Sequence, residues 1–221
     1  GSVLTPLLLK NGHRVTVIDR LLHGGESLLG VLHDPNFNFI KADLREIDAM
    51  PQALDGVDAV VHLAAIVGDP ACARDPELAR ATNLDASLKL FDLAKAKGAR
   101  RFLFASTCSN YGKMAEGEGL LNEDSPLAPV SLYAETKVGV EKALLNGRSH
   151  GGPSVTVLRC ATLFGLSPRM RFDLTVNEFT RELIVQRKLT IFGKQFWRPY
   201  VHVRDVARLM SMVLEAPVEK V

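Results

Sequence analysis

Strand-like and helix-like segments alternate along almost the whole chain, and this alternation restricts the fold more than any other feature of the sequence. Six apolar runs rich in β-branched residues are expected to be strands: 14–18, 38–41, 57–63, 101–105, 155–158 and 200–203. Several are almost continuous in Val, Ile, Leu and Phe, which is typical of strands buried on both faces of a parallel sheet. Helical periodicity lies between them, at 84–97, 131–145 and 173–187. The pattern predicts an α/β fold with a doubly wound parallel sheet.

Charge and composition exclude several classes of protein. The chain has 27 Lys and Arg against 25 Asp and Glu, a net charge of +2, and no basic run, so we expect no nucleic-acid partner and no membrane-surface partner. The longest apolar stretch, 57–67, contains two polar residues and is too short to cross a bilayer. Cys72, Cys108 and Cys160 are widely spaced and form no CxxC pair. We therefore expect no disulfide and no metal site, and, with no secretory signal visible, a reducing cytoplasmic compartment.

The first residues differ from the usual opening of such a sheet, which is a strand followed by a glycine-rich turn. The chain starts with Gly1 and Ser2 and passes directly into a helical pattern. Gly1 is either part of an expression remnant or, as we favour, the last glycine of a phosphate-binding turn whose earlier part is missing. The favoured interpretation fits Asp19, which ends the next strand where the dinucleotide fold places a ribose-binding carboxylate. The alternative for Asp19 is an ordinary carboxylate at a strand end.

Tyr133 and Lys137 are four residues apart in a predicted helix, so their side chains lie on one face. A lysine ammonium beside a tyrosine stabilises the tyrosinate and can also bind a ribose hydroxyl. Lowering a tyrosine pKa from about 10 to about 7 requires roughly 4 kcal/mol of differential stabilisation, which a neighbouring cation in a partly dry site can supply. The pair alone is a weak signal, because such pairs also arise by chance, and its context decides.

That context is the run 102–112, in which a buried strand ends in the hydroxyl residues Ser106 and Thr107. Ligands of open α/β sheets bind at the carboxyl ends of the strands. A hydroxyl there can hydrogen-bond a substrate oxygen and the phenol of Tyr133 together. The alternative is that Ser106 and Thr107 only satisfy backbone donors at the strand end. The long irregular stretch 112–129 follows, and such loops in α/β enzymes often cover a site.

Six motifs occur in a characteristic order. They are Asp19, Asp43-Leu44, His62-Leu63-Ala64-Ala65, Asn83 at a helix start, Ser-Thr-x-x-x-Tyr-Gly at 106–112 and Tyr-x-x-x-Lys at 133–137. In this order they resemble the extended short-chain dehydrogenases/reductases, specifically the nucleotide-sugar epimerase/dehydratase group that includes UDP-glucose 4-epimerases. The resemblance continues into Arg-Pro-Tyr-Val-His-Val-Arg-Asp at 198–205 and so covers essentially the whole chain.

The resemblance also implies a division of the chain. Residues 1–165 would form a Rossmann-like dinucleotide-binding domain that lacks its first strand and glycine loop. Residues 166–198 would be part of a small substrate-binding region, and 199–221 would return to the first domain as a strand and a helix. Members of the group are longer, so a C-terminal part is also expected to be missing.

The resemblance implies a role for each matching residue. It makes Tyr133 the catalytic base, Lys137 its activator and a ligand of the nicotinamide ribose, and Thr107 the hydroxyl that orients the substrate. The cofactor-binding residues that it implies, beside Tyr133 and Lys137, are Gly1, Asp19, Arg20, Asp43, Leu44, Leu63, Ala64, Ala65 and Asn83. The implied substrate-binding residues are Thr107, Cys108, Ser109, Thr162, Asn177 and Arg198. For Asn83 the alternative is a helix N-cap.

Departures from the group's pattern indicate the subtype. Dehydratases of the group follow the catalytic Thr with Asp-Glu, and here Cys108-Ser109 stands instead, which disfavours loss of water. Cys108 is also one place earlier than the acid/base cysteine of related reductases and double epimerases. Thr162 replaces a common substrate-binding Asn, so the contacts to the sugar stay open. We therefore expect a 4-epimerase acting on a nucleotide-linked hexose, a UDP-hexose above all, with a 4-keto-sugar reductase, a dehydratase and a non-catalytic binding module as the alternatives.

The cofactor and the oligomer follow from the same resemblance. Asp19 favours NAD, because a carboxylate repels a 2′-phosphate, while Arg20 directly after it leaves NADP open. A homodimer is expected through the helices that begin near Asn83 and Ser131. No metal is expected to take part.

Overall fold

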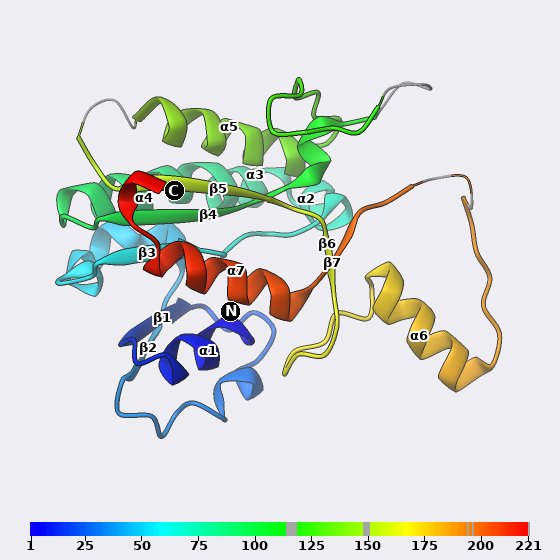
Figure 1. Ribbon diagram of the computed structural model, residues 1–221, viewed down its shortest axis with the longest axis horizontal. Helices are drawn as coiled ribbons and strands as arrows, with labels where there is room; N and C mark the ends of the chain where they lie inside the picture. The colour runs from blue at the N-terminus through cyan, green and yellow to red at the C-terminus, as the bar shows by residue number, and fades with distance from the viewer. Residues whose placement is uncertain (114–118, 148–150, 194, 196, 221) are drawn as a thin grey trace. The chain divides into compact units, whose positions relative to one another are not determined.

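The computed structural model describes residues 1–113, 119–147, 151–193, 195 and 197–220 (Figure 1). These residues form two compact units whose segments interleave along the chain. Unit 1 comprises 1–17, 21–39 and 160–215, and unit 2 comprises 18–20, 40–159 and 216–221. The functional division at residues 165 and 198 follows different boundaries and stays a prediction.

Unit 2 is built on the three-stranded sheet β3-β4-β5, formed by Ala59–His62, Arg101–Thr107 and Ser154–Cys160. Strands β3 and β4 are parallel, with Ala59 opposite Arg101 and His62 opposite Phe104. Helices α4 (Ala86–Ala96) and α5 (Leu132–Gly147) pack against each other, and α5 also packs on β4 (Figure 1). These strands and helices confirm the corresponding sequence predictions.

The core of unit 2 lies between this sheet and the two helices. Phe102 and Phe104 are two residues apart on β4, so their side chains share one face, and both are fully buried. Phe91 of α4 meets Phe102 edge to face, with ring centroids 5.3 Å apart. Val140 and Leu144, four residues apart on α5, complete the cluster. This packing fixes α5 against β4 and thereby brings the residues after β4 next to the start of α5.

Short helices fill the remainder of unit 2. They are η2 (Leu44–Ala49), η3 (Pro51–Leu54), α2 (Asp69–Arg74), α3 (Pro76–Arg80), the π-helical η4 (Ala81–Asp85), η5 (Cys108–Tyr111) and η7 (Val218–Lys220). The side chain of Asp75 caps α3 by accepting a hydrogen bond from the backbone of Leu78 at 3.0 Å. Helix α3 continues through η4 into α4, so Asn83 lies inside a helical run and the N-cap interpretation of Asn83 is wrong.

Unit 1 holds α1 (Leu4–Lys10), η1 (Glu26–Leu28), α6 (Thr175–Gln186), α7 (Val203–Glu215) and the two-stranded parallel sheet of β6 (Thr162–Phe164) and β7 (Tyr200–His202). Strands β1 (Val15–Asp19) and β2 (Phe37–Lys41) pair, and their carboxyl ends belong to unit 2. Helix α1 packs on α7, where the Asn11 amide donates to Ser211 Oγ at 3.0 Å.

All six predicted strands are present, and the α/β, Rossmann-like fold class is confirmed. Strand β6 was not predicted, because three residues between a strand and a glycine carry too little periodicity to be recognised.

Within the described ranges, no helix is both long and apolar enough to cross a membrane. The three cysteines are free thiols, and no cluster of metal-ligating side chains occurs among the described residues.

Candidate active site

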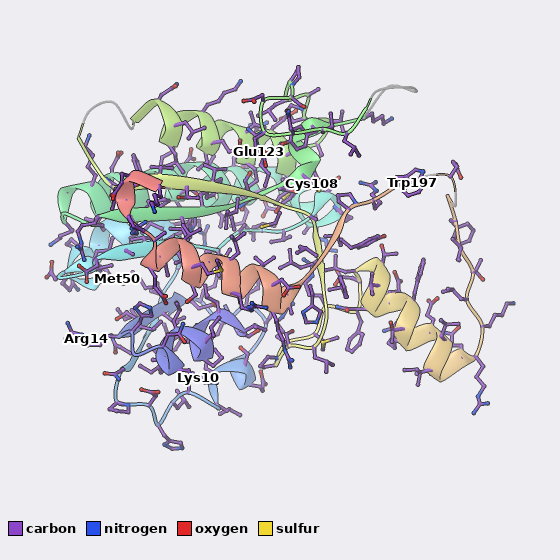
Figure 2. All side chains as sticks on the ribbon, in the orientation of Figure 1. Lys10, Arg14, Met50, Cys108, Glu123 and Trp197 are labelled. Atoms are coloured by element: carbon purple, nitrogen blue, oxygen red, sulfur yellow. The ribbon has the colours of Figure 1, made fainter. Side chains whose placement is uncertain are left out.

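Thr107 ends strand β4 and leads directly into η5. Its side chain is buried, and its Oγ1 accepts a hydrogen bond from the backbone of Ser109 at 3.1 Å, which caps η5. Accepting that bond leaves the hydroxyl proton of Thr107 available for donation. Cys108 and Ser109 follow, both half-buried, and Figure 2 shows Cys108 beside the carboxyl end of β4. The structure thus combines the two interpretations: Thr107 satisfies a backbone donor and still carries a hydroxyl proton.

Tyr133 and Lys137 lie one turn apart near the start of α5, as the spacing predicts. Tyr133 is half-buried, whereas Lys137 is only 2% exposed. The ammonium nitrogen of Lys137 is 5.9 Å from the centroid of the Tyr133 ring. A cation at this distance in a largely dry position favours the charged, tyrosinate form of the phenol.

The position of Lys137 is fixed by strand β4. Its Nζ donates to the carbonyl oxygen of Ala105 at 2.8 Å and lies 4.5 Å from the centroid of the Phe104 ring. Ala105 is two residues before Thr107, so one short segment of β4 anchors the lysine and delivers the hydroxyl. The structure therefore brings the three predicted catalytic residues to one end of β4.

A buried polar chain, which was not predicted, begins beside this lysine. His62 ends β3, stacks on Phe104 with ring centroids 5.6 Å apart, and lies 2.7 Å from Ser87 Oγ through its Nε2. Ser87 Oγ donates its own proton to the carbonyl oxygen of Asn83 at 2.8 Å, so Nε2 of His62 must be the donor to Ser87. Burial lowers the pKa of His62 to about 3, and the charge of Lys137 contributes to the shift. His62 is therefore neutral. Its ring packs on Phe104, as the Lys137 ammonium does, and its Nε2 donates to Ser87, which in turn binds Asn83.

The side chain of Asn83 binds the loop after β3 through the backbone N–H and C=O of Ile66. Its Oδ1 accepts from the amide of Ile66 at 2.7 Å, and its Nδ2 donates to the carbonyl of Ile66 at 2.9 Å. Cys72 donates to the same carbonyl at 3.3 Å, and burial raises the pKa of its thiol, as expected for a structural cysteine. Leu63, Ala64 and Ala65, the predicted cofactor-binding residues, directly precede Ile66. Asn83 thus positions their loop, and its direct contact with a cofactor stays a prediction.

The carboxyl ends of β1 and β2 carry a cluster of charged residues. Asp19 is exposed at the end of β1, and Arg20 next to it pairs with Asp43 at 3.1 Å. Arg45 binds the same carboxylate through two bonds of 3.0 and 2.8 Å. These hydrogen bonds from Arg45 lower the pKa of Asp43 to about 2, with the charge of Arg20 adding to the effect. Asp43 therefore holds Arg20 in place, and the predicted cofactor contacts of Asp19, Arg20, Asp43 and Leu44 stay predictions.

The other predicted residues lie in unit 1. Gly1 is exposed and its carbonyl accepts from Thr5 at 2.9 Å, and Arg198 is exposed ahead of β7. Thr162 is half-buried at the start of β6. Asn177 is buried on α6, where its amide accepts from Gly165 at 3.1 Å and donates to Arg171 at 3.0 Å. Asn177 thus has a structural function within unit 1, and the substrate contacts of these residues stay predictions.

Known proteins resemble this chain in sequence and in fold. The sequence profile described as "NAD dependent epimerase/dehydratase family" matches residues 1–221, the whole chain. The chain belongs to this NAD-dependent epimerase/dehydratase family. Its members are enzymes of the nucleotide-sugar epimerase/dehydratase type.

Three family members illustrate the likeness. An uncharacterised UDP-glucose epimerase of Bacillus subtilis (strain 168) is 32% identical over 98% of this chain and 70% of its own length. The structure of UDP-N-acetylglucosamine 4-epimerase from Methanobrevibacter ruminantium M1, in complex with UDP-N-acetylmuramic acid, superposes with a TM-score of 0.86 at 27% identity, covering 98% of this chain and 69% of that one. The dTDP-glucose 4,6-dehydratase of Streptomyces venezuelae, solved with NAD bound, gives 0.85 at 28% identity, with 98% and 69% covered. The epimerase and the dehydratase structures are therefore about equally similar to this chain in sequence identity and in fold.

Proposed function

We propose that the protein is a nucleotide-sugar 4-epimerase that oxidises C4 of the hexose transiently and reduces it again on the opposite face. One observation carries the proposal: Thr107, Tyr133 and Lys137 are assembled around the end of β4, while Cys108 and Ser109 stand where water loss requires an acid and a base. Neither a thiol nor a hydroxyl at these positions replaces a carboxylic acid paired with a carboxylate.

The donor groups of unit 2 fit a nicotinamide dinucleotide. Asp19 offers a carboxylate at a strand end to a ribose diol, the loop residues 63–65 offer backbone groups, and Lys137 offers an ammonium to the second ribose. Arg20 pairs with Asp43 and is directed to that carboxylate, which favours NAD over NADP. A nicotinamide bound by these residues would supply the hydride acceptor for C4 and, in the second half of the reaction, the hydride donor.

The residues of this chain would then move one proton. The phenolate of Tyr133 takes the proton from the 4-hydroxyl, and the ammonium of Lys137 stabilises the phenolate while it does so. The hydroxyl of Thr107 donates a hydrogen bond to the sugar oxygen and so holds it against Tyr133. After the keto sugar has turned over, Tyr133 returns the proton to the oxygen on the other face.

The substrate proposed is a UDP-hexose. Support comes from the relatives, of which several are UDP-glucose, UDP-glucuronate or UDP-N-acetylglucosamine epimerases by name. The nucleotide half binds away from the reacting carbon, so it can hold the substrate while the sugar ring rotates. The homodimer and the cytoplasmic location stay predictions, and light scattering on the full-length protein tests the first of them.

The test is a substrate panel. The full-length enzyme is incubated without added cofactor with UDP-, dTDP- and GDP-hexoses, and the products are followed by NMR. We expect redox-neutral conversion of a UDP-hexose into its C4 epimer. A 4-keto-6-deoxy product would show a dehydratase, and turnover only with stoichiometric NADPH would show a reductase; either result contradicts the proposal.

A further inference from the structure

An ion pair between the buried Glu141 and the half-buried Arg159 takes no part in the chemistry proposed above. Glu141 is on α5, eight residues after Tyr133 and four after Lys137, and is only 1% exposed. Arg159, near the end of β5, binds its Oε2 through Nε at 3.0 Å and through a terminal nitrogen at 2.9 Å. At a rise of 1.5 Å per residue, Glu141 is about 12 Å along the helix from Tyr133. It therefore cannot touch the reacting atoms.

The second oxygen of Glu141 binds the segment that carries Thr107. Ser106 Oγ donates to Glu141 Oε1, and Asn110 Nδ2 donates to the same oxygen at 2.7 Å and to Ser106 Oγ at 3.0 Å. Successive side chains of a strand point to opposite faces. Holding Ser106 on one face of β4 therefore determines the direction in which Thr107 points on the other.

Arg159 extends the same network to the loop after η5. Its remaining terminal nitrogen donates to the phenol oxygen of Tyr111 at 3.1 Å and to the carbonyl of Glu123 at 2.8 Å. Figure 2 shows Glu123 in this loop. Burial alone would lower the pKa of Arg159, but the hydrogen bonds to Glu141 and Tyr111 outweigh it and raise the pKa. Arg159 and Glu141 together thus join β4, η5, α5, β5 and the loop.

One detail shows that stability alone does not explain this arrangement. Asn110 directs both of its amide bonds to Ser106 and Glu141, and among the described residues its buried Oδ1 has no hydrogen-bond partner. An unsatisfied buried carbonyl oxygen is unfavourable. Replacing a buried ion pair by apolar residues is often neutral or stabilising. Both amide protons of Asn110 are thus used to hold the end of β4.

We propose that Glu141 and Arg159 are positioning residues: they hold the end of β4 so that Thr107 stays aligned with Tyr133. The proposal rests on the proposed function for its kinetic readout. Misplacing a reacting group by about 1 Å can lower the rate about 100-fold. Most of the cofactor and substrate contacts proposed above lie on other elements, so the affinities should change less than kcat.

The test compares Arg159→Lys, which keeps the charge but loses the planar fork, with Arg100→Lys. Arg100 precedes β4 and pairs with Asp58 at 2.8 Å, with both side chains about three-quarters exposed, so it is a matched control away from the site. At a temperature where circular dichroism shows both variants folded, we expect Arg159→Lys to lower kcat about 10- to 100-fold. Its KM and its NAD dissociation constant should stay within about threefold, and Arg100→Lys should match the wild type.

A double-mutant cycle separates positioning from general destabilisation. If Arg159 acts through Thr107, Arg159→Lys should lower kcat by less than about threefold in a Thr107→Ala background. An undiminished loss in that background, or an unchanged kcat in the single variant, overturns the proposal. Hydrogen exchange of residues 105–112 is measured in parallel and needs no substrate. If the wild type forms no C4 epimer, the proposed function fails, and exchange that does not rise in Arg159→Lys then overturns this proposal on its own.

Discussion

The stability of the protein should depend on pH through His62, and His62→Gln should remove that dependence. The buried imidazole of His62 has a pKa of about 3 against 6.5 for an ordinary histidine. Between these values the unfolded chain binds a proton at this position and the folded protein does not. The free energy of unfolding therefore falls as the pH falls from about 6.5 towards 3, by up to about 1.4 kcal/mol per pH unit.

The expected effect is large enough to measure by urea unfolding. From pH 6 to pH 4, protonation of His62 in the unfolded state should remove about 2–3 kcal/mol of stability. Asp43, with its pKa lowered to about 2, contributes its own loss only below about pH 4. His62→Gln stays neutral at every pH, so its stability should fall less steeply over this range, whatever it loses at pH 7 from the contact with Phe104.

The assay is the urea midpoint and slope from circular dichroism at pH 4, 5, 6 and 7. His33→Gln is the matched control, because His33 is exposed, and it should follow the wild type. If His62→Gln loses as much stability as the wild type between pH 6 and 4, then His62 is not a buried neutral group. The claim that an uncharged His62 donates to Ser87 beside Lys137 would then be refuted.

Three further substitutions test the site. Tyr133→Phe should lower kcat by about 100-fold or more with NAD affinity unchanged in a fluorescence titration, and full turnover would show that the phenol takes no part. Asn83→Ala leaves two backbone groups of the loop without partners, so urea unfolding should show a loss of about 1–3 kcal/mol together with weaker NAD binding; unchanged values would contradict its positioning role. In Gly112→Ala the new Cβ would lie 1.9 Å from the carbonyl oxygen of Ala128 at a φ of +73°, so Tm should fall, whereas Gly119→Ala, with no atom within 4 Å, should not change it.

Much of the fold could be predicted from the sequence because parallel strands and amphipathic helices have strong periodic patterns. Strand β4 is the clearest case, since Phe102, Leu103 and Phe104 are all buried in a continuous apolar run. Short elements were not predictable in this way. The π-helical turn at 81–85 exists because of packing and the bonds of Asn83, and a local pattern indicates only a helix start there.

The catalytic residues could be predicted because their spacing is a property of one helix and one strand end. The residues behind them could not, because their partners are distant in the sequence: Glu141 meets Arg159 across 18 positions and Ser106 across 35. A weak signal was present, since Glu141 continues the four-residue spacing of Tyr133 and Lys137 on a helix. His62 was noticed only as part of a motif, and its function as a neutral donor requires the positions of Ser87 and Asn83.

The central claim is that C4 of the sugar is oxidised and reduced by one and the same cofactor molecule. A UDP-hexose carrying deuterium at C4, converted by the full-length enzyme without added cofactor, tests this directly. NMR and mass spectrometry should find the label fully retained at C4 of the epimer, with no net formation of NADH. Loss of the label to solvent, or its appearance at another carbon, would contradict the proposed reaction and the roles of Thr107, Tyr133 and Lys137 in it.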